Sequence, residues 1–297
     1  MIFLYIVGEG ASNRSAQERF QHSGDTISKV FHQVLSANLL RVPTMMPASL
    51  PSWCPNEIQE NPKWFPFFKD CIGALDGTHI PAFVPLNEQK PFRNRKGFFS
   101  QNVLGVCTFD MRFLYLLAGW EGSSSDGAVL EYAISHGLNI PDGKYFLGDA
   151  GYALTRKFIT SYRGVRYHLR ELTKSRCRPR NAKELYNLRH AQLRNVIERL
   201  FGVLKRGFPV LRLEPEYAFE TQVKLVQALG LLHNFIHVIG GDDQITRQYD
   251  ADIATSNKSR KPCRQPSQTF GDEYKLAKGQ RDEIAKLMWV QYTLSNR

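Results

Sequence analysis

The sequence predicts an α/β (α+β) fold with a strand-rich core, helices before the core and a helix after it. Two short apolar runs each reach an aspartate beside glycine, at Asp76 and at Asp149, as buried strands do when they stop at a turn or a site. β-rich runs lie between the two aspartates, and a long amphipathic helix pattern, 181–206, follows them. The resulting order of elements in the core is βββαβα. We divide the chain into five predicted segments, 1–42, 43–63, 64–240, 241–270 and 271–297, of which the third is the core.

Composition allows a single core and favours a polyanionic partner. The chain has 297 residues, 42% of them hydrophobic, which suffices for a core of roughly 150–200 residues with appendages. The formal net charge is +11 at pH 7. Residues 155–212 carry 16 Lys and Arg against three acids, a local net charge of +13. Such a basic block is what a groove for a phosphate backbone requires.

Neither the cysteines nor the opening residues indicate secretion. The five cysteines form no CxxC pair, which is typical of reduced thiols in an intracellular protein. The opening apolar run, 2–7, is too short to span a membrane and lacks a basic region before it. We therefore expect no signal peptide and no contact with a membrane.

The segment 1–42 is predicted to be helical in three pieces. These are 2–7, a helix capped by Ser12 or Ser15 that ends at Phe20, and 26–40. A short helix, a turn with glycine and a longer helix suit both a plain helical hairpin and a DNA-binding helix-turn-helix, and the spacing leaves the two open. In the second case the recognition helix would open with Asp25, Thr26, Ser28 and Lys29. The chain begins inside what resembles an earlier helix, so this segment is expected to be incomplete.

The core is predicted to begin after the proline-rich linker 43–63. Its first strand is expected to end at the turn dipeptide Asp76-Gly77. A polar loop, 85–99, follows, and then strands 101–109 and 112–118 form a hairpin. The basic side chains of this loop would either contact DNA or be solvated; they are Lys90, Arg93, Arg95 and Lys96.

Three acids stand out in this core. Asp76 and Asp149 lie at predicted strand ends, and Glu198 adjoins the apolar stripe of the long helix. A carboxylate at the edge of an apolar face costs free energy unless it is paired or binds a cation. If the three acids converge, they suit Mg²⁺ or Mn²⁺, which prefer carboxylate and water oxygens. For Asp76 alone, a role in capping a hairpin turn remains an alternative.

The motifs around these acids carry a family resemblance. ALDGTHI contains Asp76, LGDAGY contains Asp149, and NVIERLFGVLKRGFPVL contains Glu198. The acids are 73 and 49 residues apart. Over most of residues 1–240 the chain resembles DDE transposases, in particular the PIF/Harbinger group and the Harbinger transposase-derived nucleases of eukaryotes.

The resemblance implies an RNase H-like core that cuts double-stranded DNA and transfers the cut strand. In the family's scheme Asp76 would bridge two divalent ions, Mg²⁺ or Mn²⁺, while Asp149 and Glu198 would each hold one. The resemblance also implies a nuclear protein, and related systems use a separate Myb-like DNA-binding protein as partner. A homo-oligomer is compatible with the sequence, which does not fix the oligomeric state.

Basic residues near the acids are candidates for DNA contact. Between Asp149 and Glu198 basic and aromatic side chains alternate, which suits either a DNA surface or a solvated loop that doubles as a nuclear targeting signal. On the long helix Arg194 and Lys205 share the face of Glu198, where each would steer a phosphate or pair with the acid. The candidate contacts are Arg163, Arg166, Arg170, Lys174, Arg194 and Lys205.

Three histidines receive structural roles. His233 and His237 have metal-ligand spacing on the helix pattern 223–239, but no third ligand lies near them in the sequence, so a structural role is favoured. His79 is expected to hydrogen-bond close to Asp76 rather than bind a metal.

The C-terminal part of the chain is predicted to fall into two pieces. The segment 240–268 lacks an apolar period and is predicted to be disordered. The last helix, 271–292, carries an apolar patch that would dock on the core or on a partner.

Two further functions stay open. The chain could be a domesticated, non-cutting scaffold that binds DNA or protein, since a fold does not fix a function. The presence of all three acids argues against this. An RNase H-type enzyme that cuts RNA in hybrids would use the same metal chemistry.

Overall fold

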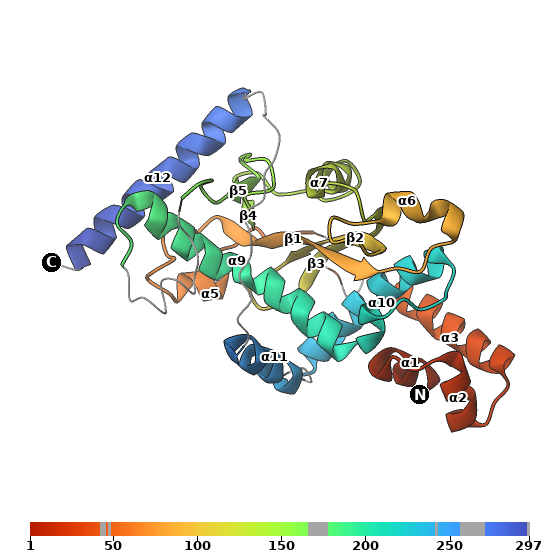
Figure 1. Cartoon of the computed structure of the whole chain (residues 1–297). Helices are drawn as coiled ribbons and strands as arrows, with labels where there is room; N and C mark the ends of the chain where they lie inside the picture. The colour runs from red at the N-terminus through yellow and green to blue at the C-terminus, as the bar shows by residue number, and fades with distance from the viewer. Residues whose placement is uncertain (42–45, 47–48, 166–177, 241–242, 256–270, 296–297) are drawn as a thin grey trace.

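The computed structural model describes residues 1–41, 46, 49–165, 178–240, 243–255 and 271–295. At its centre is a five-stranded mixed sheet, with helices on both faces (Figure 1). The strands are β1 (Cys71–Pro81), β2 (Ser100–Cys107), β3 (Phe113–Glu121), β4 (Tyr145–Gly148) and β5 (Phe158–Thr160), in the order β3-β2-β1-β4-β5. β1, β2 and β3 are antiparallel neighbours, whereas β4 and β5 run parallel to β1.

Some helices pack on the faces of the sheet, and others lie beyond it on both sides (Figure 1). The described helices and 3-10 turns are α1 (Ile2–Glu9), α2 (Asn13–Phe20), α3 (Gly24–Leu39), α5 (Asn56–Gln59), η1 (Leu86–Glu88), α6 (Gln89–Phe92), α7 (Asp126–Ser135), α9 (Ala182–Gly207), η2 (Pro209–Arg212), α10 (Phe219–Val238), α11 (Asp243–Thr255) and α12 (Asp272–Ser295). The predicted order βββαβα is confirmed, with the short β5 as an unpredicted addition. No helix in these ranges is long and apolar enough to cross a membrane.

Successive side chains of β1 are buried in two separate hydrophobic cores. Ala74 belongs to the larger core, which includes α9 and α10, whereas Leu75 belongs to the smaller core under α7. This alternation follows from the pleat of a strand, which sends neighbouring side chains to opposite faces. α9 and α7 accordingly cover opposite faces of the sheet (Figure 1).

The first strand does not stop at Asp76-Gly77, which corrects the sequence prediction. β1 continues to Pro81, and its second half pairs with β2 from Asp76↔Gly105 to Pro81↔Ser100. The turn signal of an Asp-Gly pair is local, and it yields here to a continuous antiparallel ladder. The strand that does stop at this point is the parallel neighbour β4, which ends at Gly148.

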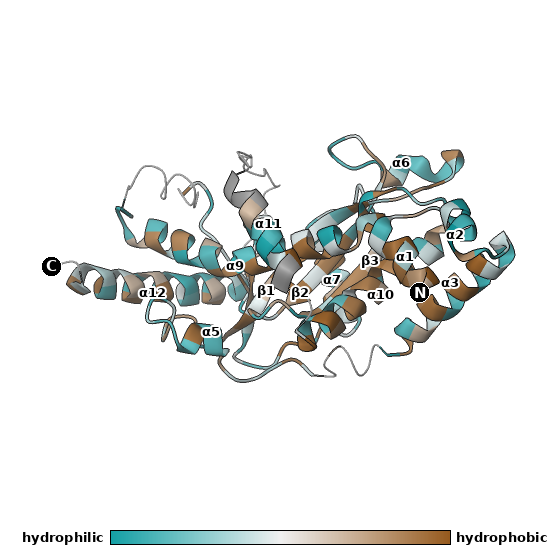
Figure 2. Cartoon of the chain, turned by 90° about the horizontal axis from the view of Figure 1, so that it is seen from below, coloured by the Kyte–Doolittle hydropathy of each residue, from teal (hydrophilic) through white to brown (hydrophobic). Residues whose placement is uncertain are grey.

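The N-terminal helices pack on the core. Ser12 caps α2 and Ser23 caps α3, each through a side chain that accepts a backbone N–H of the first turn. Phe31 of α3 stacks on Tyr217 with ring centroids 5.1 Å apart. α1 and α10 are largely hydrophobic and α2 is hydrophilic (Figure 2). The helix-turn-helix role of α2 and α3 stays a prediction.

The C-terminal part differs from the expected disorder. α11 forms within the segment predicted to lack structure, because Tyr249 packs on Gly202 of α9 and Ile245 packs beside Gly207. The last helix, α12, docks on the core, where Ala285 and Met288 are buried, and it therefore takes the first of the two predicted roles.

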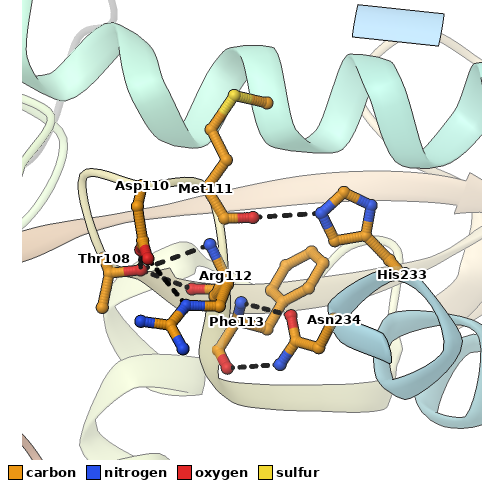
Figure 3. A network of polar contacts seen from close by, with 7 residues as sticks. All are labelled: Thr108, Asp110, Met111, Arg112, Phe113, His233 and Asn234. Atoms are coloured by element: carbon orange, nitrogen blue, oxygen red, sulfur yellow. Dashed lines mark hydrogen bonds and ion pairs between the residues drawn. The ribbon is translucent and has the colours of Figure 1, made fainter. Parts of the chain in front are cut away.

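α10 is fixed to the β2–β3 hairpin by a polar network (Figure 3). The Asn234 side chain accepts the N–H of Phe113 at 2.8 Å and donates to its carbonyl at 2.9 Å. His233 Nε2 lies 3.0 Å from the Met111 carbonyl oxygen, which bears out the structural role predicted for this histidine. Asp110 pairs with Arg112 at 2.7 Å within the turn.

Replacing Asn234 by alanine is expected to destabilise the fold by about 2–4 kcal/mol, because the buried N–H and C=O of Phe113 lose their partners. Urea unfolding followed by circular dichroism measures the change. Asn38→Ala is the control, since this side chain donates to Val34 within its own helix. Equal stabilities of the two variants would contradict the role given to Asn234.

Candidate active site

The first two acids meet because β1 and β4 run side by side in the same direction. Ala74 of β1 is in register with Leu147 of β4. Asp76 and Asp149 each come two residues after these partners, so both lie at the edge where β4 ends. Neighbouring strands are about 4.8 Å apart, which brings the two aspartates together as the sequence predicts.

Each aspartate is oriented by the backbone of the next residue. Asp76 Oδ1 accepts the N–H of Gly77 at 2.9 Å, and Asp149 Oδ1 accepts the N–H of Ala150 at 2.7 Å. Hydrogen bonds of this kind hold a carboxylate in one orientation and leave its second oxygen for another partner.

Glu198 reaches the same place from α9. Asn181 caps this helix by accepting the N–H of Glu184, and a buried apolar face that includes Ile197 and Phe201 packs it on the sheet. The Phe201 ring lies so close to Gly105 that a Cβ there would stand 2.6 Å from it. Gly105 is the β2 partner of Asp76, so this close approach brings α9 over the first aspartate.

Arg194 joins two of the acids. Its Nη1 donates to Asp76 Oδ2 at 2.9 Å, and its Nη2 donates to Glu198 Oε1 at 2.5 Å. Burial acts to lower the pKa of the guanidinium, but Asp76, Glu198 and then Asp149 outweigh burial and raise it above its ordinary value. Of the two predicted roles, the structure thus gives Arg194 the pairing role.

The acids fit a hard divalent cation by their chemistry. All three ligands are carboxylates, and a cationic group already lies between two of them. In this arrangement the guanidinium takes the central position, and among the described residues no cluster of three metal-ligating side chains surrounds one point. An ion held by Asp76, Asp149 and Glu198 would therefore replace Arg194.

The other five predicted DNA contacts fall into three groups. Arg163 is exposed, and its Nε donates to the Ala150 carbonyl at 2.9 Å, directly beside Asp149. Lys205 is largely buried and donates to Thr78 Oγ1 at 2.7 Å and to the His79 carbonyl at 2.8 Å. Arg166, Arg170 and Lys174 lie outside the described residues.

A fourth acid, Asp126, at the start of α7, also lies near the site. Its Oδ1 accepts from the buried Asn102 at 3.0 Å and would stand 2.6 Å from a Cβ on Gly77. The pKa of Tyr152 is raised first by burial and then by the negative charges of Asp76, Asp126 and Asp149. The Tyr152 hydroxyl is buried and has no hydrogen-bond partner in the described structure. No local sequence signal separates this aspartate from an ordinary helix start.

His79 lies beside the site without joining the acids. Its Nδ1 is 3.1 Å from Ser100 Oγ, in keeping with the hydrogen-bonding role predicted for it. Burial lowers its pKa, which favours the neutral ring near pH 7.

A mixed sheet with acids gathered where β4 ends is the arrangement expected of a nuclease-like or transposase-like class of protein. The sequence profile of the DDE superfamily endonuclease matches residues 75–234, and the chain belongs to this family. The DDE endonuclease domain is RNase H-like, in agreement with the mixed sheet. Residues 1–39 match a domain of unknown function, DUF8040. No solved structure matches the chain.

Similar proteins point the same way. The rat protein named "Putative nuclease HARBI1" is 28% identical over 169 residues, which are 55% of this chain and 45% of that protein. "Protein ALP1-like" of Arabidopsis thaliana is 28% identical over 183 residues, which are 55% of this chain and 44% of that protein. The Xenopus laevis protein with the same name as the rat one is 26% identical over 203 residues, 65% of this chain and 52% of that protein. The matched region spans about half the length of these relatives. Two of these three relatives carry a nuclease name.

Replacing Arg194 by glutamine is expected to destabilise the protein by about 3 kcal/mol, because two partly buried carboxylates lose their counter-charge. For a chain of this size the loss lowers the Tm by roughly 6–12 °C. Excess Mg²⁺ or Mn²⁺ should recover part of this loss, because the divalent ion replaces the lost positive charge. Thermal unfolding in EDTA and in each metal measures both effects.

Arg199→Gln provides a matched control one turn further along α9. This arginine pairs with Asp250 at 2.6 Å on the surface, so its loss should cost about 1 kcal/mol or less and leave no metal dependence. If divalent ions stabilise both variants equally, the guanidinium does not stand in for a bound ion.

Proposed function

We propose that the protein is a divalent-metal-dependent DNA endonuclease of the transposase type, with Asp76, Asp149 and Glu198 as its catalytic and metal-binding residues. The observation that carries the proposal is the single guanidinium held by both Asp76 and Glu198, with Asp149 at the adjoining strand end. Acids from three separate elements that converge on one cationic position suit metal-assisted hydrolysis of a phosphodiester.

In this mechanism Asp76, Asp149 and Glu198 would together hold the divalent metal ions. Bound Mg²⁺ or Mn²⁺ lowers the pKa of an attacking water and stabilises the leaving 3′ oxygen. The backbone N–H groups of Gly77 and Ala150 keep the two aspartates in orientation. Arg194, once released from the acids, would offer its guanidinium to the oxygens of the substrate phosphate.

Two further steps belong to the same proposal. The 3′-hydroxyl freed by cleavage attacks a phosphodiester of a second DNA in the same site. A new phosphodiester forms, the attacked one breaks and the second DNA leaves with a free 3′-hydroxyl, which is strand transfer. The exposed Arg163, beside Asp149, contacts the backbone of the bound DNA. Double-stranded DNA is the substrate, the nucleus is the place of action, and a Myb-like partner protein supplies further DNA binding.

A non-cutting scaffold is the alternative. The Arg194 bridge is compatible with it, because a paired set of acids is stable without metal. An RNase H-type activity on hybrids is a third possibility with the same site chemistry. Cleavage assays separate all three.

The test is cleavage of a labelled DNA duplex by the purified protein in Mg²⁺ or Mn²⁺, beside an RNA–DNA hybrid of the same sequence. We expect the duplex to be cut faster. Asp76→Asn, Asp149→Asn and Glu198→Gln should each reduce the rate by at least about 100-fold, since even residues that only orient a metal ligand cost 10–100-fold. Circular dichroism confirms that each variant is folded.

Asp142→Asn serves as the control, because this aspartate is exposed in the turn before β4 and should leave the rate unchanged. Metal-dependent cutting that survives all three substitutions would exclude this site. Tight duplex binding without any cutting would favour the scaffold, and preferential cutting of the hybrid would favour the RNase H-type activity.

A further inference from the structure

A cavity of about 440 Å³ lies beside the second half of β1. Gly77, Thr78, His79 and Pro81 form one side of it, and α9, η2 and the loop before β2 form the others. It starts one residue after Asp76 and extends away from the acids. With a rise of about 3.3 Å per residue, it lies within a few nucleotides' length of the proposed cutting point.

The cavity lies along the part of β1 that β4 does not cover. β4 pairs with β1 from Cys71 to Ala74 and ends at Gly148. From Gly77 to Pro81 the described register pairs β1 with β2. A polymer lying across Asp76 and Asp149 can therefore continue along β1 without meeting another strand.

Positive charge surrounds this cavity. Lys96 comes from the loop before β2, Lys205 from α9 and Arg212 from the end of η2. No acid is among the described residues that line it. Lys96 and Arg212 are exposed, and neither forms an ion pair in the described part of the chain.

Lys205 is fixed rather than mobile. Its ammonium group donates to Thr78 Oγ1 and to the His79 carbonyl, which places it over the uncovered edge of β1. Burial, and then the charge of Lys96, lower its pKa to about 8. Holding a charge in such a place costs folding free energy, and an anion bound beside it would offset that cost.

We infer that this cavity is a phosphate-binding subsite that holds the DNA backbone a few nucleotides away from the cut phosphodiester. Three cations from three elements, one of them largely buried and oriented, suit a phosphate group. Phe98 gives the wall one half-buried aromatic ring, on which a sugar or base can rest. The inference rests on the proposed function for the nature of the polymer.

The experiment measures binding of a fluorescent DNA duplex by anisotropy in EDTA over a series of salt concentrations. Arg212→Gln should weaken binding at low salt several-fold. It should also reduce the slope of log K against log salt by about 1, the value for one lost phosphate contact. The double variant Lys96→Gln/Arg212→Gln should weaken binding further, and both side chains are exposed, so folding is retained.

Lys69→Gln is the matched control, because this exposed lysine lies just before the opposite end of β1. Its slope should equal that of the wild type. Inorganic phosphate provides a second probe and should raise the Tm of the wild type more than that of the double variant. Equal slopes for the double variant and Lys69→Gln would overturn the inference, whether or not phosphate alone binds.

Binding in EDTA requires no catalysis, so the two proposals fail separately. If the double variant changes the salt slope but the protein never cuts DNA, the subsite is supported and the nuclease proposal is excluded. If cutting depends on Asp76 but the double variant leaves the salt slope unchanged, the nuclease proposal is supported and the subsite is excluded.

Discussion

The salt bridge of Arg194 with Asp76 and Glu198 is the interaction on which the arrangement of the site depends. Carboxylates brought together in a partly buried place repel one another and require a counter-charge. The guanidinium provides it with two donors in a fixed fork, which links β1 to α9 at the point where the acids meet. The close packing of Phe201 on Gly105 brings helix and strand near enough for that geometry. In the proposed metal-bound form Arg194 would leave the acids, and its guanidinium would then be available to the substrate.

The two halves of β1 have different neighbours, and the site lies where one half meets the other. Its first half is buried between β2 and β4, while its second half pairs with β2 and faces the cavity on its other side. Ligands commonly bind beyond the carboxyl ends of parallel strands, where a neighbouring strand leaves room. Here β4 leaves that room by ending one residue before Asp149. The same strand thus carries an acid at the point of change and the wall of the basic cavity beyond it.

Much of this fold could be predicted from the sequence, because strand runs, caps and the long helix have strong local patterns. The prediction that β1 ends at Asp76-Gly77 was wrong because the turn signal is local, whereas the ladder with β2 joins residues about 20–30 apart in the chain. β5 has three residues, too few for a period to emerge. α11 depends on contacts of Ile245 and Tyr249 with α9. The nearness of Asp126 to Gly77 likewise arises only on folding.

The basic block 155–212 shows why a count of charges cannot by itself define a DNA surface. Arg194 is bound to the acids, Arg189 is buried over the ring of Phe67, and Arg199 pairs with Asp250. These cations stabilise the fold, and in this arrangement they are not presented to a partner. Arg163 is exposed beside Asp149, Arg212 is exposed at the basic cavity that starts after Asp76, and Lys96 joins Arg212 there from outside the block. A backbone held between Arg163 and the basic cavity would cross the acids between these two points. Within the described part of the block, the net charge therefore does not show which cations are exposed to a partner; burial and pairing decide that.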